Sequence, residues 1–196
     1  MSRTAKIERK TLETDIALKL SIAGSGKAQL DTGVPFLEHM LVLWCRHGFF
    51  DLQIKASGDL EVDFHHLVED VGLCLGRALR EALGKKEGIH RYGSSLVPMD
   101  DALALAVVDF SGRPYLHYEV CLPPGKVGEM DTELFQEFWR AVVNEGQFNL
   151  HLKTLHGHNR HHLVEAIFKA AGRAMDEASS LRSGLTGVLS SKGRLD

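Results

Sequence analysis

The pentapeptide His-His-Leu-Val-Glu occurs twice in this chain, once from His65 and again from His161. The likeness extends beyond the pentapeptide, because GFFDLQIKAS before the first copy matches GQFNLHLKTL before the second. Two unrelated helices that merely share a preference for the same terminal residues would not have matching neighbours. The repeat therefore indicates an internal duplication, and the two halves of the chain are expected to fold alike.

Hydrophobic periodicity predicts a mixed order of strands and helices in both halves, from period-2 alternation for strands and amphipathic spacing for helices. The first half is expected to contain, in order, a strand over 11–23, a helix over 35–48, a strand over 50–57 and a helix over 65–84. The second half is expected to contain two strands within 101–122, a helix over 133–146, a strand over 148–155 and a helix from His161.

The Gly-Ser-Gly-Lys segment at 24–27 allows two interpretations. A phosphate-binding P-loop would need the GxxxxGK[ST] spacing, which is missing, and Ala28 follows the lysine. A hairpin turn after the first strand is the preferred interpretation.

These patterns predict an α+β fold with internally duplicated halves, each a small mixed β-sheet packed against α-helices. The halves are expected at about 1–88 and 89–180, with a C-terminal tail after them. No linker or low-complexity segment separates them, so 1–196 is expected to form a single domain. With 44% hydrophobic residues, a chain of this length can bury a shared core.

Composition restricts the class of partner. The formal net charge is −3, and the charged residues are of mixed sign, so we expect no binding of nucleic acid and no membrane anchor. Small molecules are the expected ligands. The three cysteines, Cys45, Cys74 and Cys121, lack CxxC spacing, and the N-terminal stretch has no apolar core of a signal peptide. The sequence therefore predicts a cytoplasmic protein.

The spacing within the repeated motif predicts metal ligands. On a helix, side chains at i and i+4 share a face, whereas adjacent ones point about 100° apart. His65 and Glu69 can therefore hold an ion that His66 cannot reach, and the second motif has the same geometry. The simplest arrangement is a pair of sites related by a pseudo-twofold axis, one from His65, Glu69 and His162 and the other from His161, Glu165 and His66. The sequence thus predicts two metal ions.

The alignment of the repeats adds one candidate ligand to each site. His39 joins the site of His66, and Glu137 joins the site of His65, with His151 as its rival. Imidazoles with carboxylates favour manganese or iron and could accept zinc. Most histidines are not ligands, so structural or solvated roles are expected for the remaining ones, His47, His90, His117, His156 and His158.

At this point several motifs together resemble the imidazoleglycerol-phosphate dehydratases, over about residues 3–195. They are TLETDI, DTGVPFLEHML, GDLEVDFHHLVEDVGLCLG, GIHRYGSSLVPMDDAL, DFSGRP, NLHLKTLHGHNRHHLVEAIFKA and SSKG. The resemblance implies a metal-dependent hydro-lyase of histidine biosynthesis, which removes water from imidazoleglycerol phosphate to give imidazole acetol phosphate. It also implies two Mn²⁺ ions per active site and a homo-oligomer of 24 subunits, with sites completed between subunits.

The resemblance also implies roles for substrate-binding residues. Glu13 is the expected catalytic residue, because a carboxylate near metal ions can act first as a base and then as an acid. Arginine offers a planar fork to phosphate oxygens, and the SSKG segment offers hydroxyls, amides and a charge, so that the C-terminal tail closes over the phosphate. The residues expected to contact the substrate are Glu13, Arg91, Arg113, Ser190, Ser191 and Lys192.

Two other classes of function use the same metal ligands. A dimetal phosphate hydrolase would release free phosphate, whereas a dehydratase gives a keto product. A metal store, or an assembly held together by metal, would bind ions without turnover. That third class leaves Glu13, both arginines and the SSKG segment without a purpose, so the dehydratase is preferred.

Overall fold

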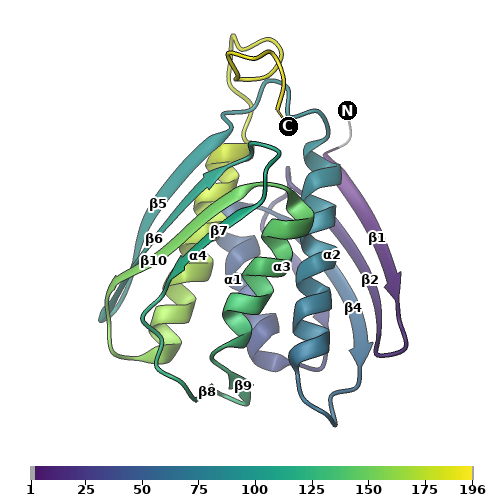
Figure 1. Ribbon diagram of the computed structural model, residues 1–196, viewed down its shortest axis with the longest axis vertical. Coiled ribbons are helices and arrows are strands. Elements are labelled where there is room, and N and C mark those ends of the chain that lie inside the picture. Colours follow the sequence, from purple (N-terminus) through teal and green to yellow (C-terminus); the bar gives the residue numbers. More distant parts are fainter. Residues whose placement is uncertain (1–2, 196) are drawn as a thin grey trace.

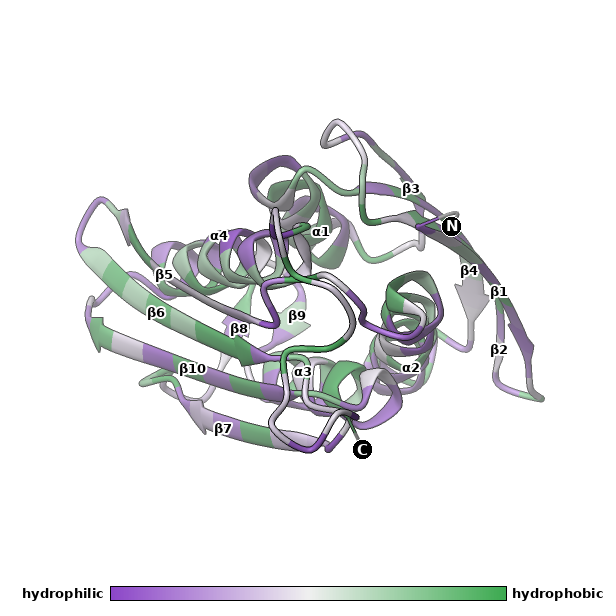
Figure 2. Cartoon of the chain, turned by 90° about the horizontal axis from the view of Figure 1, so that it is seen from above, coloured by the Kyte–Doolittle hydropathy of each residue, from purple (hydrophilic) through white to green (hydrophobic). Residues whose placement is uncertain are grey.

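In the computed structural model, which describes residues 3–195, two four-stranded sheets enclose a layer of helices (Figure 1). The view from above shows the three layers, with one sheet on each side of the helices (Figure 2). Residues 1–2 and 196, the ends of the expected single domain, lie outside the described residues. The C-terminal tail projects beyond one end of the molecule.

The first half builds one sheet and two helices. Its elements are β1 (Thr4–Lys10), β2 (Thr14–Ser21), β3 (Ala28–Asp31), α1 (Pro35–Gly48), β4 (Asp51–Gly58) and α2 (His65–Leu83). The strand order is β1-β2-β4-β3, and β3 alone among these strands runs parallel to its neighbour, β4.

The second half repeats this topology. Its elements are β5 (Tyr92–Met99), β6 (Ala102–Asp109), β7 (Tyr115–Glu119), β8 (Lys126–Val127), β9 (Met130–Asp131), α3 (Leu134–Gly146), β10 (Asn149–His156) and α4 (Arg160–Ser179). The strand order is β5-β6-β10-β7, with β7 parallel to β10, and β8 pairs with β9 as a small separate ribbon. The predicted α+β fold with duplicated halves is confirmed.

Paired glycines let the helices approach closely. Helix α1 packs against α4, and α2 packs against α3. A Cβ atom on Gly172 would lie 2.6 Å from the Trp44 carbonyl oxygen, and one on Gly76 would lie 2.3 Å from the Val142 carbonyl oxygen. Gly76 and Gly172 occupy the same place in the two copies of the motif helix, so the duplication extends to the helix contacts.

Both sheets bury one face against the helices, but their outer faces differ. In β2, Ile16, Leu18 and Leu20 are buried, and the residues that alternate with them, Asp15, Ala17 and Lys19, are exposed. This alternation is that of a half-buried antiparallel strand. The outer face of the second sheet carries large exposed apolar side chains, namely Tyr92, Leu96, Tyr115 and Leu155.

Two features differ from the expectations. Strands β1, β3 and β5 were not predicted. The 24–27 segment is not a hairpin turn, because β2 and β3 both pair with β4 rather than with each other. Its loop is held by Asp51 Oδ1, which accepts hydrogen bonds from the backbone N–H groups of Ser25 and Lys27. Among residues 3–195, no helix is long and apolar enough to cross a membrane.

Candidate active site

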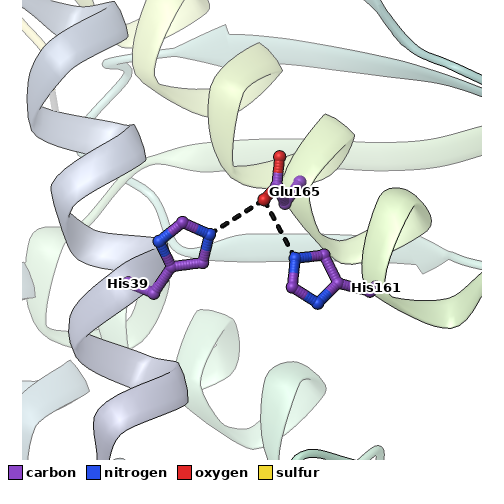
Figure 3. A group of neighbouring side chains, drawn as sticks. All are labelled: His39, His161 and Glu165. Atoms are coloured by element: carbon purple, nitrogen blue, oxygen red, sulfur yellow. Dashed lines mark hydrogen bonds and ion pairs between the residues drawn. The ribbon is translucent and has the colours of Figure 1, made fainter.

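Helices α1 and α4 bring His39, His161 and Glu165 together (Figure 3). The Nε2 atoms of His39 and His161 lie 2.8 and 3.0 Å from the same carboxylate oxygen, Glu165 Oε1. His161 and Glu165 are one turn apart on α4, and His39 reaches them because α1 packs against α4. The i, i+4 geometry expected for the second motif is therefore present, and His39 joins it.

Glu165 is held as a carboxylate. Its side chain is only 8% exposed, and Lys169, one turn further along α4, donates to Oε2 at 2.7 Å. Burial, the largest single effect, opposes ionisation. Hydrogen bonds from Lys169 and from the two imidazoles outweigh it and lower the pKa of Glu165 to about 2. A buried anion beside two imidazoles is a typical site for a cation.

The donor set fits a divalent transition metal. The three ligand atoms lie within 4.8 Å of one another. Ligands about 2.1 Å from an octahedral ion are roughly 3 Å apart, close to the observed separations between nitrogen and oxygen. Side chains of both histidines are nearly half exposed, so one side of the cluster is open to further ligands. Imidazole and carboxylate together suit manganese or iron.

The second histidine of each motif points elsewhere. His162 Nδ1 lies 2.6 Å from Asp101 Oδ1, and His66 Nδ1 lies 2.9 Å from Asp59 Oδ2. The adjacent rings are nearly perpendicular, at 85° in the second motif and 81° in the first. Neighbouring histidines therefore diverge around the helix axis, as the helical spacing predicts.

The same contacts set the charge on these groups. The hydrogen bond that His66 donates to the Asp59 carboxylate raises the pKa of His66 above its ordinary value. The pKa of Asp101 is well below its usual range, because backbone N–H groups of Asn159 and His158 and the ring of His162 all bind its carboxylate. Both second histidines thus face an anion on the Nδ1 side.

The remaining candidate ligands are not gathered within one chain. His65 Nε2 lies 3.9 Å from Glu69 Oε2, while Glu137 makes an ion pair with Arg140 at 2.6 Å. His151 lies on the outer face of β10, beside the rings of Tyr115 and His117, and so faces away from the helices. Throughout residues 3–195, His39, His161 and Glu165 are the one group close enough to share an ion.

Glu13 lies at the turn between β1 and β2, close to the first motif. Its side chain is 56% exposed, and Oε2 is 4.0 Å from His66 Nδ1. The turn is fixed by Thr11, whose hydroxyl accepts hydrogen bonds from the N–H groups of Glu13 and Thr14. The carboxylate therefore stands at the start of α2 with freedom to move.

Arg91 connects the core to the C-terminal tail. Its guanidinium makes a bidentate pair with Asp109, at 2.7 and 3.1 Å, and donates to the Leu189 carbonyl oxygen at 2.7 Å. The next residues of the tail follow directly: Ser190 is partly buried, and Ser191 and Lys192 are exposed. Arg91 is thus beside the SSKG segment.

Lys86 is a buried cation that the sequence did not single out. It is 7% exposed, with φ of +59°. Burial lowers the pKa of Lys86, Arg91 and Arg113 lower it further, and Asp109 partly offsets them. Lys86 thus interacts electrostatically with Arg91 and Arg113, and with Arg80 as well.

The cluster of His39, His161 and Glu165 and the tail lie at opposite ends of α4. His161 is in the first turn of this helix, whereas the N–H of Arg91 donates to the Ala178 carbonyl oxygen in its last turn. At 1.5 Å per residue, the two ends are roughly 25 Å apart. Figure 1 shows the tail at the end opposite to β8 and β9.

Two hollows flank the cluster of His39, His161 and Glu165. One of about 320 Å³ has His39 in its wall and is lined mainly by apolar side chains, including Phe36, Phe64 and Met130. An open one of about 520 Å³ borders His161, and its lining mixes apolar residues such as Pro123 with polar ones such as Arg160. There is room for a partner side chain or a small ligand on either side of the imidazoles.

Comparison with known proteins agrees with these features. The family model for imidazoleglycerol-phosphate dehydratase matches residues 32–175. The imidazoleglycerol-phosphate dehydratase of Geobacter sulfurreducens is 56% identical over 195 residues, and that of Shouchella clausii is 54% identical, each with 100% of both chains covered.

Solved structures have the same fold. The crystal structure of imidazoleglycerol-phosphate dehydratase from Staphylococcus aureus has a TM-score of 0.83 at 40% identity, covering 91% of this chain and 99% of that one. The crystal structure of IGPD from Pyrococcus furiosus has a TM-score of 0.83 at 36% identity, covering 96% and 100%. The chain therefore belongs to the imidazoleglycerol-phosphate dehydratase family, the dehydratases of histidine biosynthesis.

Proposed function

We propose that this chain converts imidazoleglycerol phosphate to imidazole acetol phosphate and water at a site with two metal ions. The observation that carries the proposal is the cluster of His39, His161 and Glu165, built on one copy of a duplicated motif. A single structural ion would explain the cluster alone. It would not explain the second copy of the motif, with its own histidine and glutamate pair.

We infer two Mn²⁺ ions per active site, with iron or zinc as substitutes. The ligands of the first ion are His39, His66, His161 and Glu165. Those of the second are His65, Glu69, Glu137 and His162. The outward direction of His151 favours Glu137 over it, and Glu137 would exchange Arg140 for the ion.

We infer further that each active site is completed by more than one chain. The second histidines turn away from the first histidines of their own motifs. The phosphate-binding candidates lie roughly 25 Å from the metal-binding cluster along α4, a distance that a small phosphorylated imidazole cannot span. One chain supplies the metal-binding end and another supplies the tail.

An apolar outer face supports assembly of this kind. Tyr92, Leu96, Tyr115 and Leu155 are each about half exposed or more on the second sheet. The corresponding face of the first sheet carries the exposed lysines Lys6, Lys19 and Lys55. Exposed apolar patches of this kind mark protein interfaces. We propose a homo-oligomer, and specifically the 24-subunit form that the resemblance implies.

Within this arrangement, different residues of the chain have different roles in the reaction. Bound metal ions would supply Lewis-acid activation and a template for the imidazole ring. Glu13 takes a proton from the middle carbon of the side chain and passes it to the hydroxyl that departs from the carbon next to the ring, so that water leaves. The resulting enol becomes the ketone. Arg91 and Arg113 hold the phosphate, and the tail residues Ser190, Ser191 and Lys192 close over it.

The cellular compartment follows from the class of enzyme. We propose that the enzyme works in the cytoplasm, and its three free cysteines suit a reducing compartment. Its substrate is a small phosphorylated imidazole, so neither nucleic acid nor membrane is a partner.

The decisive experiment is an anaerobic assay of the chelated protein with imidazoleglycerol phosphate, followed by readdition of Mn²⁺, Fe²⁺ or Zn²⁺. We expect a keto product that depends on added metal, with Mn²⁺ the most effective. Free inorganic phosphate as the product would identify a hydrolase instead. Metal binding without turnover would identify a store or a structural ion.

A further inference from the structure

The second histidine of each motif has a carboxylate at the same ring atom. Asp59 Oδ2 lies 2.9 Å from His66 Nδ1, and Asp101 Oδ1 lies 2.6 Å from His162 Nδ1. A carboxylate at Nδ1 favours the tautomer with hydrogen on that nitrogen, which leaves the lone pair on Nε2. The Nε2 atom of each second histidine is then the one available to a metal ion.

The duplication does not account for this match. Asp101 immediately precedes β6, and the residue that immediately precedes β2 in the first half is Glu13. Asp59 lies six residues before His65, where the second motif has Leu155 before His161. Different segments therefore bring a carboxylate to Nδ1 of the second histidine in each half. This indicates that the function of that histidine requires a carboxylate at Nδ1.

Asp101 is held firmly in place. Its Oδ2 accepts hydrogen bonds from the N–H groups of His158 and Asn159, at 2.7 and 3.0 Å. Asn159 in turn caps α4, because its side chain accepts from the N–H of His161. Asp100 Oδ2 is 3.6 Å from His162 Nε2, too far for a hydrogen bond, and its side chain is 72% exposed. Asp101, in the turn between β5 and β6, therefore fixes Nδ1 of His162 and leaves Nε2 accessible.

Asp59 is kept in place against a free-energy cost. Its Oδ1 is buried and has no hydrogen-bond partner within residues 3–195. A buried unpaired carboxylate oxygen destabilises the fold, so such groups in native proteins commonly have a functional reason. Among the described residues, the side chain that hydrogen-bonds to Asp59 is His66.

We propose that Asp59 and Asp101 are positioning residues that fix the tautomer and direction of His66 and His162, and so present Nε2 of each to a metal ion. The inference rests on the two metal sites of the proposed function and assigns each its own carboxylate. Carboxylates behind metal-bound histidines commonly raise metal affinity by 10- to 100-fold.

The test is a titration of the chelated full-length protein with Mn²⁺ alone, for wild type, Asp59→Asn, Asp101→Asn and the control Asp15→Asn. Asp15 is an exposed carboxylate on β2 that pairs with Lys10, so its variant should bind like wild type. We expect each of the other variants to retain one tight site and to weaken the second by about 10- to 100-fold. Affinities equal to wild type in both variants would overturn the inference.

A double-mutant cycle separates positioning from folding. In a His66→Ala background the histidine is gone, so Asp59→Asn should cause no further loss of Mn²⁺ affinity. An additional loss of equal size would mean that Asp59 acts on the fold and not through His66. Unfolding of each metal-free variant gives an independent measure of stability. If wild type itself binds no Mn²⁺, the proposed function fails; if wild type binds two ions and the variants match it, this inference alone fails.

Discussion

Glu13 and Asp101 occupy equivalent positions in the two halves, each as the last residue before the second strand of its sheet. Asp101 binds His162 at 2.6 Å, whereas Glu13 remains 4.0 Å from His66. Asp59 makes the corresponding hydrogen bond in the first half. The same position thus holds a carboxylate that is hydrogen-bonded to a motif histidine in the second half, Asp101, and one that is not in the first half, Glu13. The Glu13 carboxylate is therefore suited to proton transfer.

Glu13→Gln should therefore keep both metal ions and lose turnover. General acid–base groups contribute about 100- to 10,000-fold to rate, so kcat should fall within that range. Metal analysis and steady-state kinetics on the same sample check the prediction. A variant with wild-type kcat would exclude Glu13 from the reaction.

Arg113→Ala should raise KM for the phosphorylated substrate. Hydrogen bonds between charged partners contribute about 1.5–3 kcal/mol, which corresponds to roughly 10- to 100-fold in affinity. Arg77→Ala removes an exposed arginine that pairs with Glu81 and serves as the matched control. An unchanged KM for Arg113→Ala, measured with kcat in the same assay, would argue against phosphate binding by this residue.

Leu96→Glu should disrupt assembly. Leu96 is 58% exposed on the apolar outer face of β5, and a charge buried there in an interface would be costly. Light scattering should detect smaller particles, with activity reduced in parallel because sites between chains are lost. The control is Lys19→Glu on the lysine-rich face of the first sheet. Particles of wild-type mass from Leu96→Glu would show that this face is not an interface.

Stability of the metal-free protein should depend on the ionisation of Glu165. Its pKa is lowered from 4.5 to about 2, so its contribution is fully present above pH 4.5 and is lost as pH falls towards 2. A shift of this size corresponds to roughly 3 kcal/mol of unfolding free energy. The difference in unfolding free energy between wild type and Glu165→Gln should shrink over that interval. A constant difference would contradict the electrostatic account of the cluster.

Much of the fold could be predicted because its signals are local. The helices have amphipathic spacing, and the repeat reveals the duplication without any structure. Strands β1 and β5 were missed because few of their residues are buried: Ala5 and Ile7 in one, Gly93 and Val97 in the other. Their conformation depends on pairing with β2 and β6, which is a tertiary effect.

The site was predictable to a similar extent. The i, i+4 pairs follow from helix geometry, and the repeat alignment led to His39. Asp101 was missed because its partner His162 lies 61 positions away, and acids in a turn are ordinarily solvated. Lys169 could have been found, because it is at i+4 from Glu165 on the same helix face.

The central claim is that different chains complete each other's metal sites, and a subunit-mixing experiment tests it most directly. His66→Ala and His161→Ala chains carry different affinity tags. Each variant is purified alone, and particles that contain both variants are obtained by co-expression and purification through both tags in turn. Each variant alone should be inactive and deficient in metal. In mixed particles an intact His161 from one chain can meet an intact His66 from another, so random mixing should restore about a quarter of the sites. Mixed particles of full mass that stay as inactive and as metal-poor as either parent would contradict the account.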